Sequence, residues 1–171
     1  MLDLQPDRSD AAQPASVVSK LLAQGVQCGS YLLAFNFDWA RQIVDEFDLV
    51  PVPRAPAWVL GAVNVNGLIV PVIDIDNYFS ESTAPSQLQR GQRLLLGGVQ
   101  AEDAESAFAI VFSQTPAQLE YDARAVSDLA VLPLRLQEVC KGIASAEQGK
   151  IYIEIDPQRL MDALAAELSI I

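Results

Sequence analysis

The sequence predicts an all-β protein of 171 residues in which one helix closes the chain. Three observations support this fold class. An Asn66-Gly67 pair lies between two apolar runs, which is typical of a tight hairpin turn. Short runs of strand-forming residues recur along the chain, with turn-forming residues between them. Only the segment 157–168 repeats its leucines with the spacing of an amphipathic helix, and Asp156 and Pro157 suit its N-cap and first helical position.

Residues 1–16 predict a disordered tail, because a segment rich in Asp, Gln, Pro, Ser and Ala cannot bury enough apolar area to offset the entropy cost of ordering. The remaining residues, 17–171, have the length of one ordinary domain. No apolar run approaches the roughly 20 residues of a membrane span, and the first residues lack the basic and apolar regions of a signal peptide. With two isolated cysteines, Cys28 and Cys140, this predicts a cytoplasmic protein with no direct membrane insertion.

The charge of the chain limits the classes of partner. Its formal net charge of −11 repels phosphate backbones and anionic lipids. We therefore expect no nucleic-acid partner and favour another protein or a neutral ligand.

The first two strands are predicted over 20–23 and 30–35, where apolar residues gather. From Phe35 to Trp39 aromatic residues alternate with polar ones, so the second strand is expected to continue through Trp39 with one apolar and one polar face. Trp39 is expected to fill the core. For Phe37, a place in the core and a role as an interface anchor both remain open.

The segment 58–75 carries the strongest local signal, because it contains the hairpin. Asn66 and Gly67 both tolerate the positive φ of a type I′ turn. Residues 68–73 are apolar and predict a strand that is buried on both faces. Pro71 within it requires either a bulge or a position that needs no ladder N–H.

The rest of the chain alternates loops and strand pairs. Prolines predict an extended crossover over 48–54, and polar residues predict a surface loop over 81–92. Two further hairpins are predicted, one from 93–97 and 108–112 around an acidic tip at 101–106, the other from 139–144 and 150–155.

The hairpin segment also carries a resemblance to a known family. The runs Pro56-Ala-Trp-Val-Leu-Gly61, Asn64-Val-Asn-Gly67 and Ile69-Val-Pro-Val-Ile-Asp74 resemble the signature of the CheW-like domain, the bacterial chemotaxis coupling adaptor. The usual form of that signature is a G-x-x-N-x-R-G turn that leads into an apolar V-P-V-x-D-L strand. The resemblance implies two small five-stranded SH3-like β-barrels that share a central hydrophobic core, with the C-terminal α-helix packed beside them.

The sequence predicts no active site. The chain has no histidine, which removes the commonest general base and metal ligand near neutral pH. No lysine stands at the S-x-x-K spacing of a Ser–Lys pair. Residues 74–77 resemble the start of a calcium loop, but Phe79 occupies the position where the sharp turn needs glycine. We therefore expect a non-enzymatic protein that needs no cofactor and no metal.

The resemblance implies which residues contact partners. In the family, the strand equivalent to 40–43 and the turn at 66–67 form part of a groove between the barrels, which meets receptor helical tips and the kinase regulatory domain. The candidate protein-binding residues in this sequence are therefore Ala40, Gln42, Asn66 and Gly67, together with Phe37 as a possible anchor.

Three of these candidates depart from the family pattern. Ala40 replaces a usual Val, Gln42 a usual Glu, and Asn66 a usual Arg. An arginine donates a charged, bidentate pair of hydrogen bonds that asparagine cannot reproduce, so an ion-paired contact through the turn is not expected.

Two functions remain open from the sequence. In the first, the chain is a non-enzymatic adaptor that couples a methyl-accepting chemoreceptor tip to the regulatory domain of a CheA-type histidine kinase, in flagellar chemotaxis or in type IV pilus control. In the second, it is a diverged CheW-like module that binds another protein or a small ligand outside a chemosensory array. Gln42 and Asn66 favour the second.

Overall fold

The computed structural model describes residues 21–98, 107–121, 130–145 and 149–168. The predicted tail, 1–16, and the predicted acidic tip, 101–106, lie outside this part of the chain. The described elements, in order, are β1 (Leu21–Cys28), β2 (Tyr31–Asn36), β3 (Ala40–Val44), β4 (Val59–Val65), β5 (Leu68–Ile73), α1 (Ile75–Ser80), β6 (Arg93–Gly97), β7 (Phe108–Tyr121), α2 (Leu134–Val139), β8 (Cys140–Ser145), β9 (Ile151–Ile155) and α3 (Pro157–Leu168).

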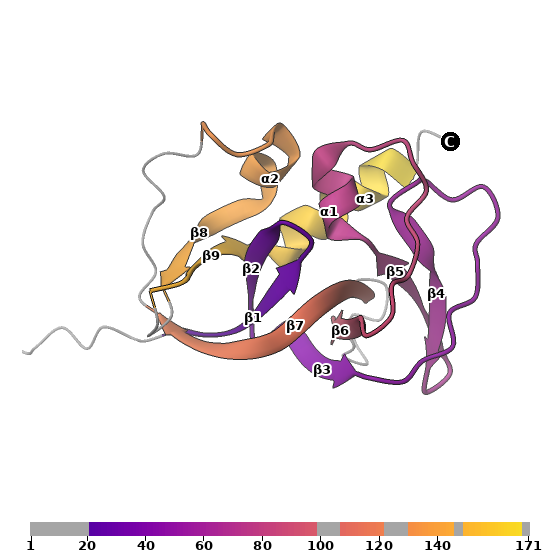
Figure 1. Ribbon diagram of the computed structural model, residues 1–171, viewed down its shortest axis with the longest axis horizontal. Coiled ribbons are helices and arrows are strands. Elements are labelled where there is room, and N and C mark those ends of the chain that lie inside the picture. Colours follow the sequence, from indigo (N-terminus) through magenta and orange to yellow (C-terminus); the bar gives the residue numbers. More distant parts are fainter. Residues whose placement is uncertain (1–20, 99–106, 122–129, 146–148, 169–171) are drawn as a thin grey trace, which may run out of the picture.

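The strands form two five-stranded barrels, as the resemblance implied. The first contains β1, β2, β8, β9 and the second half of β7, in which Ser113 and residues 117–121 pair with β1. The second contains β3, β4, β5, β6 and the first half of β7, in which residues 108–112 pair with β6 and β5. Figure 1 shows β7 as one long, curved strand that runs from one barrel into the other.

A hydrophobic core lies between the two barrels and is shared by them. β2 contributes Leu33 and Phe35, and β7 contributes Ile110 and Phe112. The helix α3 closes this core with Leu160 and Leu164, both of which are buried. Trp58 is buried in the same cluster, as a core residue. The shared core and the closing helix are therefore confirmed.

The predicted N-cap of the closing helix is also confirmed. The Asp156 carboxylate accepts hydrogen bonds from the backbone N–H groups of Gln158 and Arg159 at 3.0 and 3.1 Å. Two first-turn donors that have no partner within the helix are satisfied in this way.

The predicted hairpin at Asn66 and Gly67 joins β4 to β5. Both residues have positive φ, 51° at Asn66 and 87° at Gly67, as a type I′ turn requires. The Gly67 N–H donates a 2.8 Å hydrogen bond to the side-chain oxygen of Asn64, which fixes the turn from within the hairpin.

The strand from Phe35 does not continue through Trp39, contrary to the prediction. β2 ends at Asn36, whose side-chain oxygen and carbonyl both accept from the Trp39 N–H, at 3.0 and 3.2 Å. These bonds curl the chain into a turn that carries Phe37. The Trp39 ring still packs inward, between Phe35 and Phe108, with centroid separations of 5.0 and 4.6 Å.

The prediction that 68–73 is buried on both faces is wrong at the start of the strand. Ile69 is 66% exposed, because β5 pairs with β7 only at Val72 and Ile73 and its earlier residues lie beyond that contact. Pro71 lies opposite Ala62, whose N–H and C=O both bond to Val50. The ladder therefore requires no N–H from Pro71, which is one of the two alternatives for this proline.

Two short helices were missed. α1 and α2 have six residues each, which is too few for a helical period to appear in the sequence. A weaker signal existed for α1, since Asp74 is an N-cap whose carboxylate accepts from the Asn77 N–H at 3.1 Å. None of the described helices combines the length and apolar character needed to cross a membrane.

Arg135 on α2 joins all three helices. Its guanidinium lies 2.7 Å from a carboxylate oxygen of Glu167 on α3 and 3.4 Å from Glu81, which caps α1. It also donates a 2.8 Å hydrogen bond to the carbonyl of Tyr78 and lies over the Tyr78 ring at 4.6 Å. The other oxygen of Glu167 accepts from the Trp58 indole N–H at 3.2 Å, so the contact reaches the second barrel.

We expect Gly67→Val to lower the free energy of unfolding by about 1–3 kcal/mol, because a β-branched residue is strained at this φ. A Cβ at Gly67 would meet no atom within 4 Å, so the expected loss of stability comes from backbone strain and not from a steric clash. Chemical denaturation measures it. Gly67→Asn is the matched control and should cost less, whereas equal midpoints for all three proteins would contradict the turn assignment.

We expect Arg135→Lys to lower the free energy of unfolding by about 1–3 kcal/mol, because an ammonium cannot serve two carboxylates, a carbonyl and a ring together. Arg159→Lys is the control, since the Arg159 side chain is 60% exposed and losing its 3.7 Å contact with Asp156 should change stability by less than about 0.5 kcal/mol. Thermal melts of both variants test this, and equal losses would contradict the central role of Arg135.

We expect neither cysteine to react with a disulfide reagent in the native protein between neutral pH and about pH 9. Burial, followed by the charges of Asp74 and Asp76, raises the pKa of Cys28 well above its ordinary range, and burial also raises the pKa of Cys140. The thiols therefore stay protonated to a higher pH in the folded state than in the unfolded chain. Because of this difference, the free energy of unfolding decreases as the pH rises past the ordinary thiol pKa. Both thiols should react in denaturant, and rapid labelling of the native chain would contradict their burial.

Candidate protein-binding site

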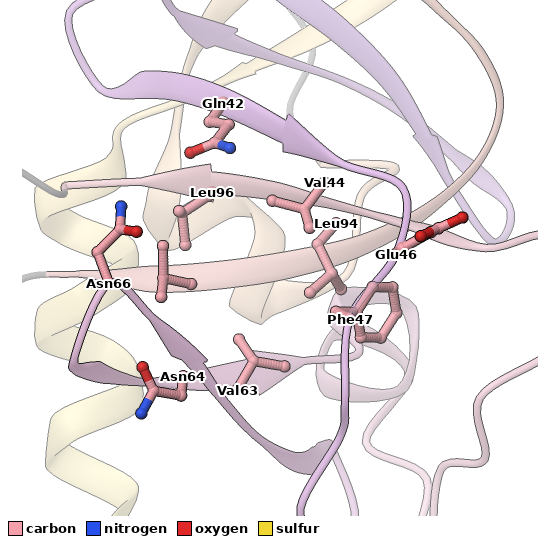
Figure 2. Close-up of a pocket in the computed structure, with 10 residues that line it drawn as sticks. Gln42, Val44, Glu46, Phe47, Val63, Asn64, Asn66, Leu94 and Leu96 are labelled. Carbon is pink, nitrogen blue, oxygen red and sulfur yellow. The ribbon is translucent and has the colours of Figure 1, made fainter.

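The second barrel is open along one side, between β3 and β4, which are the outer strands of its sheet. One end of this gap is closed where Val50 and Ala62 exchange two backbone hydrogen bonds of 2.8 Å. Toward the Asn66 turn the two strands separate. We call this opening the seam (Figure 2); it encloses a cavity of about 190 Å³ lined by Gln42, Val44, Glu46, Phe47, Val63, Asn64, Val65, Asn66, Leu94 and Leu96.

The floor of the seam is apolar. Leu94 and Leu96 from β6 and Val63 from β4 are buried members of the second barrel's own core cluster. Val44 and Phe47 are partly buried and pack against the same cluster. The seam is therefore the point at which the interior of this barrel reaches the surface.

The rim of the seam is built from amide side chains. Figure 2 shows Gln42 on β3 and Asn66 at the hairpin on opposite sides of the apolar floor. Both residues are exposed, and neither side chain makes a hydrogen bond to another residue in the described part of the chain. Asn64 lies on the same side as Asn66, with its side-chain oxygen occupied by the Gly67 N–H. Glu46 stands at the other end of the opening.

Three of the five predicted binding residues meet at this seam. Gln42 and Asn66 line it, and Gly67 completes the turn that carries Asn66. The cavity belongs to the second barrel alone rather than to the space between the barrels. The resemblance had implied a groove between the barrels.

The other two predicted residues lie elsewhere. Ala40 is only 7% exposed and packs into the shared core opposite Gly97, so its side chain can influence a partner only through the position of β3. Phe37 is half-buried at a separate depression of about 370 Å³ beside the first barrel, which also involves Leu22 and Lys141.

The apolar floor was missed by the sequence reasoning. Val44 and Phe47 lie just beyond the strand that the resemblance marked, and Leu94 and Leu96 were assigned only to a hairpin. A usable signal was present, because alternate residues of the strand 93–97 must face the same way. Leu94 and Leu96 do so, while Leu95 faces the shared core.

Four titratable side chains in the described part of the chain have a raised pKa. Burial raises the pKa of Tyr31 and of Tyr78, in addition to those of the two thiols, so these groups stay protonated at neutral pH. Within the described ranges, no three Cys, Asp or Glu side chains come together in a way that could hold a metal ion. What the site offers is an apolar surface with hydrogen-bonding amides around it, which is the composition of a binding surface.

Comparisons with known proteins agree with this fold. The structure is similar to the crystal structure of the scaffolding protein TtCheW from Thermoanaerobacter tengcongensis, with a TM-score of 0.62, 14% sequence identity, and coverage of 88% of this chain and 90% of that one. No curated protein sequence matches the chain significantly. A family model described as the CheW-like domain matches residues 23–165. That match spans both barrels and most of α3, and the chain belongs to the CheW-like domain family.

Proposed function

We propose that this chain is a non-enzymatic scaffold that couples a chemoreceptor to a CheA-type histidine kinase in the cytoplasm. The observation that carries the proposal is the CheW-like domain, which spans residues 23–165 with both barrels and the shared core intact. A scaffold needs surfaces that hold two partners side by side rather than a reactive group. Kinase activity would then change with small shifts in these contacts, and no cofactor is needed.

The seam supplies one such surface. It is lined by Gln42 and Asn66, two of the residues that the resemblance marks for partner contact, and it has an apolar floor that a partner can bury. The depression at Phe37 lies on the first barrel and offers a second place of contact. A coupling protein requires two separate contact surfaces on one chain, and the seam and the depression at Phe37 are two such surfaces.

A second candidate function is favoured by the chemistry of the seam. Gln42 and Asn66 are neutral where the family pattern carries an acidic and a basic residue. A diverged module that binds a different protein, outside a chemosensory array, would account for both replacements. A small ligand is a poorer fit at the seam, since a cavity of about 190 Å³ is below the roughly 300–1,000 Å³ of small-molecule sites.

Titration calorimetry with the receptor tip and the kinase regulatory domain from the same genome separates the two functions. We expect Phe37→Ala to weaken binding by roughly thirtyfold, the loss of about 2 kcal/mol that an aromatic anchor carries, and Gln42→Ala to weaken it less. Gln118→Ala is the control, because Gln118 is an exposed glutamine on β7 that lines neither the seam nor the depression at Phe37, and it should leave binding unchanged.

Restoring the family residues tests whether the replacements at positions 42 and 66 have changed which partner the chain prefers. Gln42→Glu with Asn66→Arg should improve binding to a partner from a standard chemotaxis system more than to the native partner. Unchanged melting temperatures must accompany all these variants. If the wild-type chain binds neither a receptor tip nor a kinase regulatory domain from its own genome, the coupling function is wrong and the diverged module remains.

A further inference from the structure

We propose that the seam binds a short extended or looped segment of a partner protein through that segment's own peptide groups. One apolar side chain of the segment lies on the floor, and a basic side chain lies beside Glu46. This deepens the proposed function, on which it rests for the identity of the protein that carries the segment.

The backbone edge of β4 is available at Asn64. The N–H and C=O of Ala62 both point away from β5, since both bond to Val50. The N–H and C=O groups of successive residues in an antiparallel strand point to alternate sides. Asn64 is two residues beyond Ala62, so its N–H and C=O groups point to the same side as those of Ala62. There the pairing with Val50 has ended, and no strand in the described part of the chain pairs with β4 on that side. The edge of β4 is thus open where it borders the seam.

The amide rim suits a peptide backbone better than a charged group. Each of Gln42 and Asn66 carries a donor and an acceptor, which is the same pair that a peptide group presents. A partner helix uses its own N–H and C=O groups internally, except at its ends. A segment with free peptide groups, either extended or in a loop, can therefore use all of these contacts.

The cavity and its charge define the side chains of the segment. A volume of about 190 Å³ over Leu94, Leu96 and Val63 accommodates an apolar side chain and excludes a large ligand. Glu46 is exposed and forms no ion pair with a residue in the described ranges, whereas its neighbour Asp45 pairs with Arg93 at 3.4 Å. In a chain with a net charge of −11, a cation is the complement at that end.

A peptide titration tests the proposal without receptor or kinase. The probe is acetyl-Gly-Ser-Leu-Gly-Lys-Gly-amide, added to the full chain at millimolar concentration and followed by amide NMR spectra. We expect shifts at the Asn64 backbone N–H and at the side-chain NH₂ groups of Gln42 and Asn66. The N-methyl-leucine version, which lacks one peptide N–H but keeps the side chain, should bind about fivefold weaker, as for the loss of one hydrogen bond.

A double-mutant cycle tests the charge. Norleucine in place of lysine should weaken binding to the wild-type chain, and Glu46→Gln should abolish that difference. Glu138→Gln, at an exposed carboxylate on α2, is the control and should preserve it. Equal binding of the N-methylated peptide, or shifts that fall outside the seam, would overturn the proposal.

The outcome is separable from that of the proposed function. Peptide binding at the seam without any receptor or kinase binding supports the proposal and assigns the segment to another partner. Receptor or kinase binding without peptide shifts at the seam overturns this proposal alone.

Discussion

The structure depends on the pairing of one strand, β7, with both barrels. Residues 108–112 pair with the second barrel, and Ser113 and residues 117–121 pair with the first, within one strand that runs from Phe108 to Tyr121. Its register against β1 shifts between Gly25 and Gln27, where Gln114 of β7 has a positive φ of 65°, so the irregularity lies where the strand passes from one barrel to the other. Side chains from this strand supply the middle of the shared core, so neither barrel can bury its apolar face without the other. The seam has its position because β7 leaves β3 and β4 as the outer strands of the second barrel.

The predictable parts of the fold were those in which a local signal agreed with the tertiary structure. Asn66 and Gly67 predicted the hairpin, and Asp156 and Pro157 predicted the start of α3, because turn and cap chemistry act within a few residues. The alternation from Phe35 to Trp39 gave a wrong prediction, because here the local signal disagreed with the tertiary structure. There the Asn36 side chain bonds to the Trp39 N–H and ends the strand, so local side-chain chemistry overrode the hydrophobic period.

The candidate binding site was predictable only in part. Gln42 and Asn66 were found through the resemblance, and both lie at the seam. The apolar floor could not be found from one segment, since Val63 and Leu94 come from strands that the barrel brings together from distant parts of the chain. The open edge at Asn64 depends on where the pairing of Val50 ends, and such a boundary is set by tertiary structure rather than by local sequence.

The placement of the two tryptophans gives the molecule a pair of built-in optical probes. Trp39 lies between Phe35 and Phe108, over Gly97, where the strands of the two barrels meet. Trp58 lies beside Tyr78, and its indole N–H bonds to the Glu167 carboxylate that Arg135 holds. Indole emission depends on packing and on nearby charge, so a variant that keeps only one tryptophan would report on the surroundings of that residue alone. The emission of Trp39 would report on the contact between the barrels, and the emission of Trp58 would report on the packing of the helices against them.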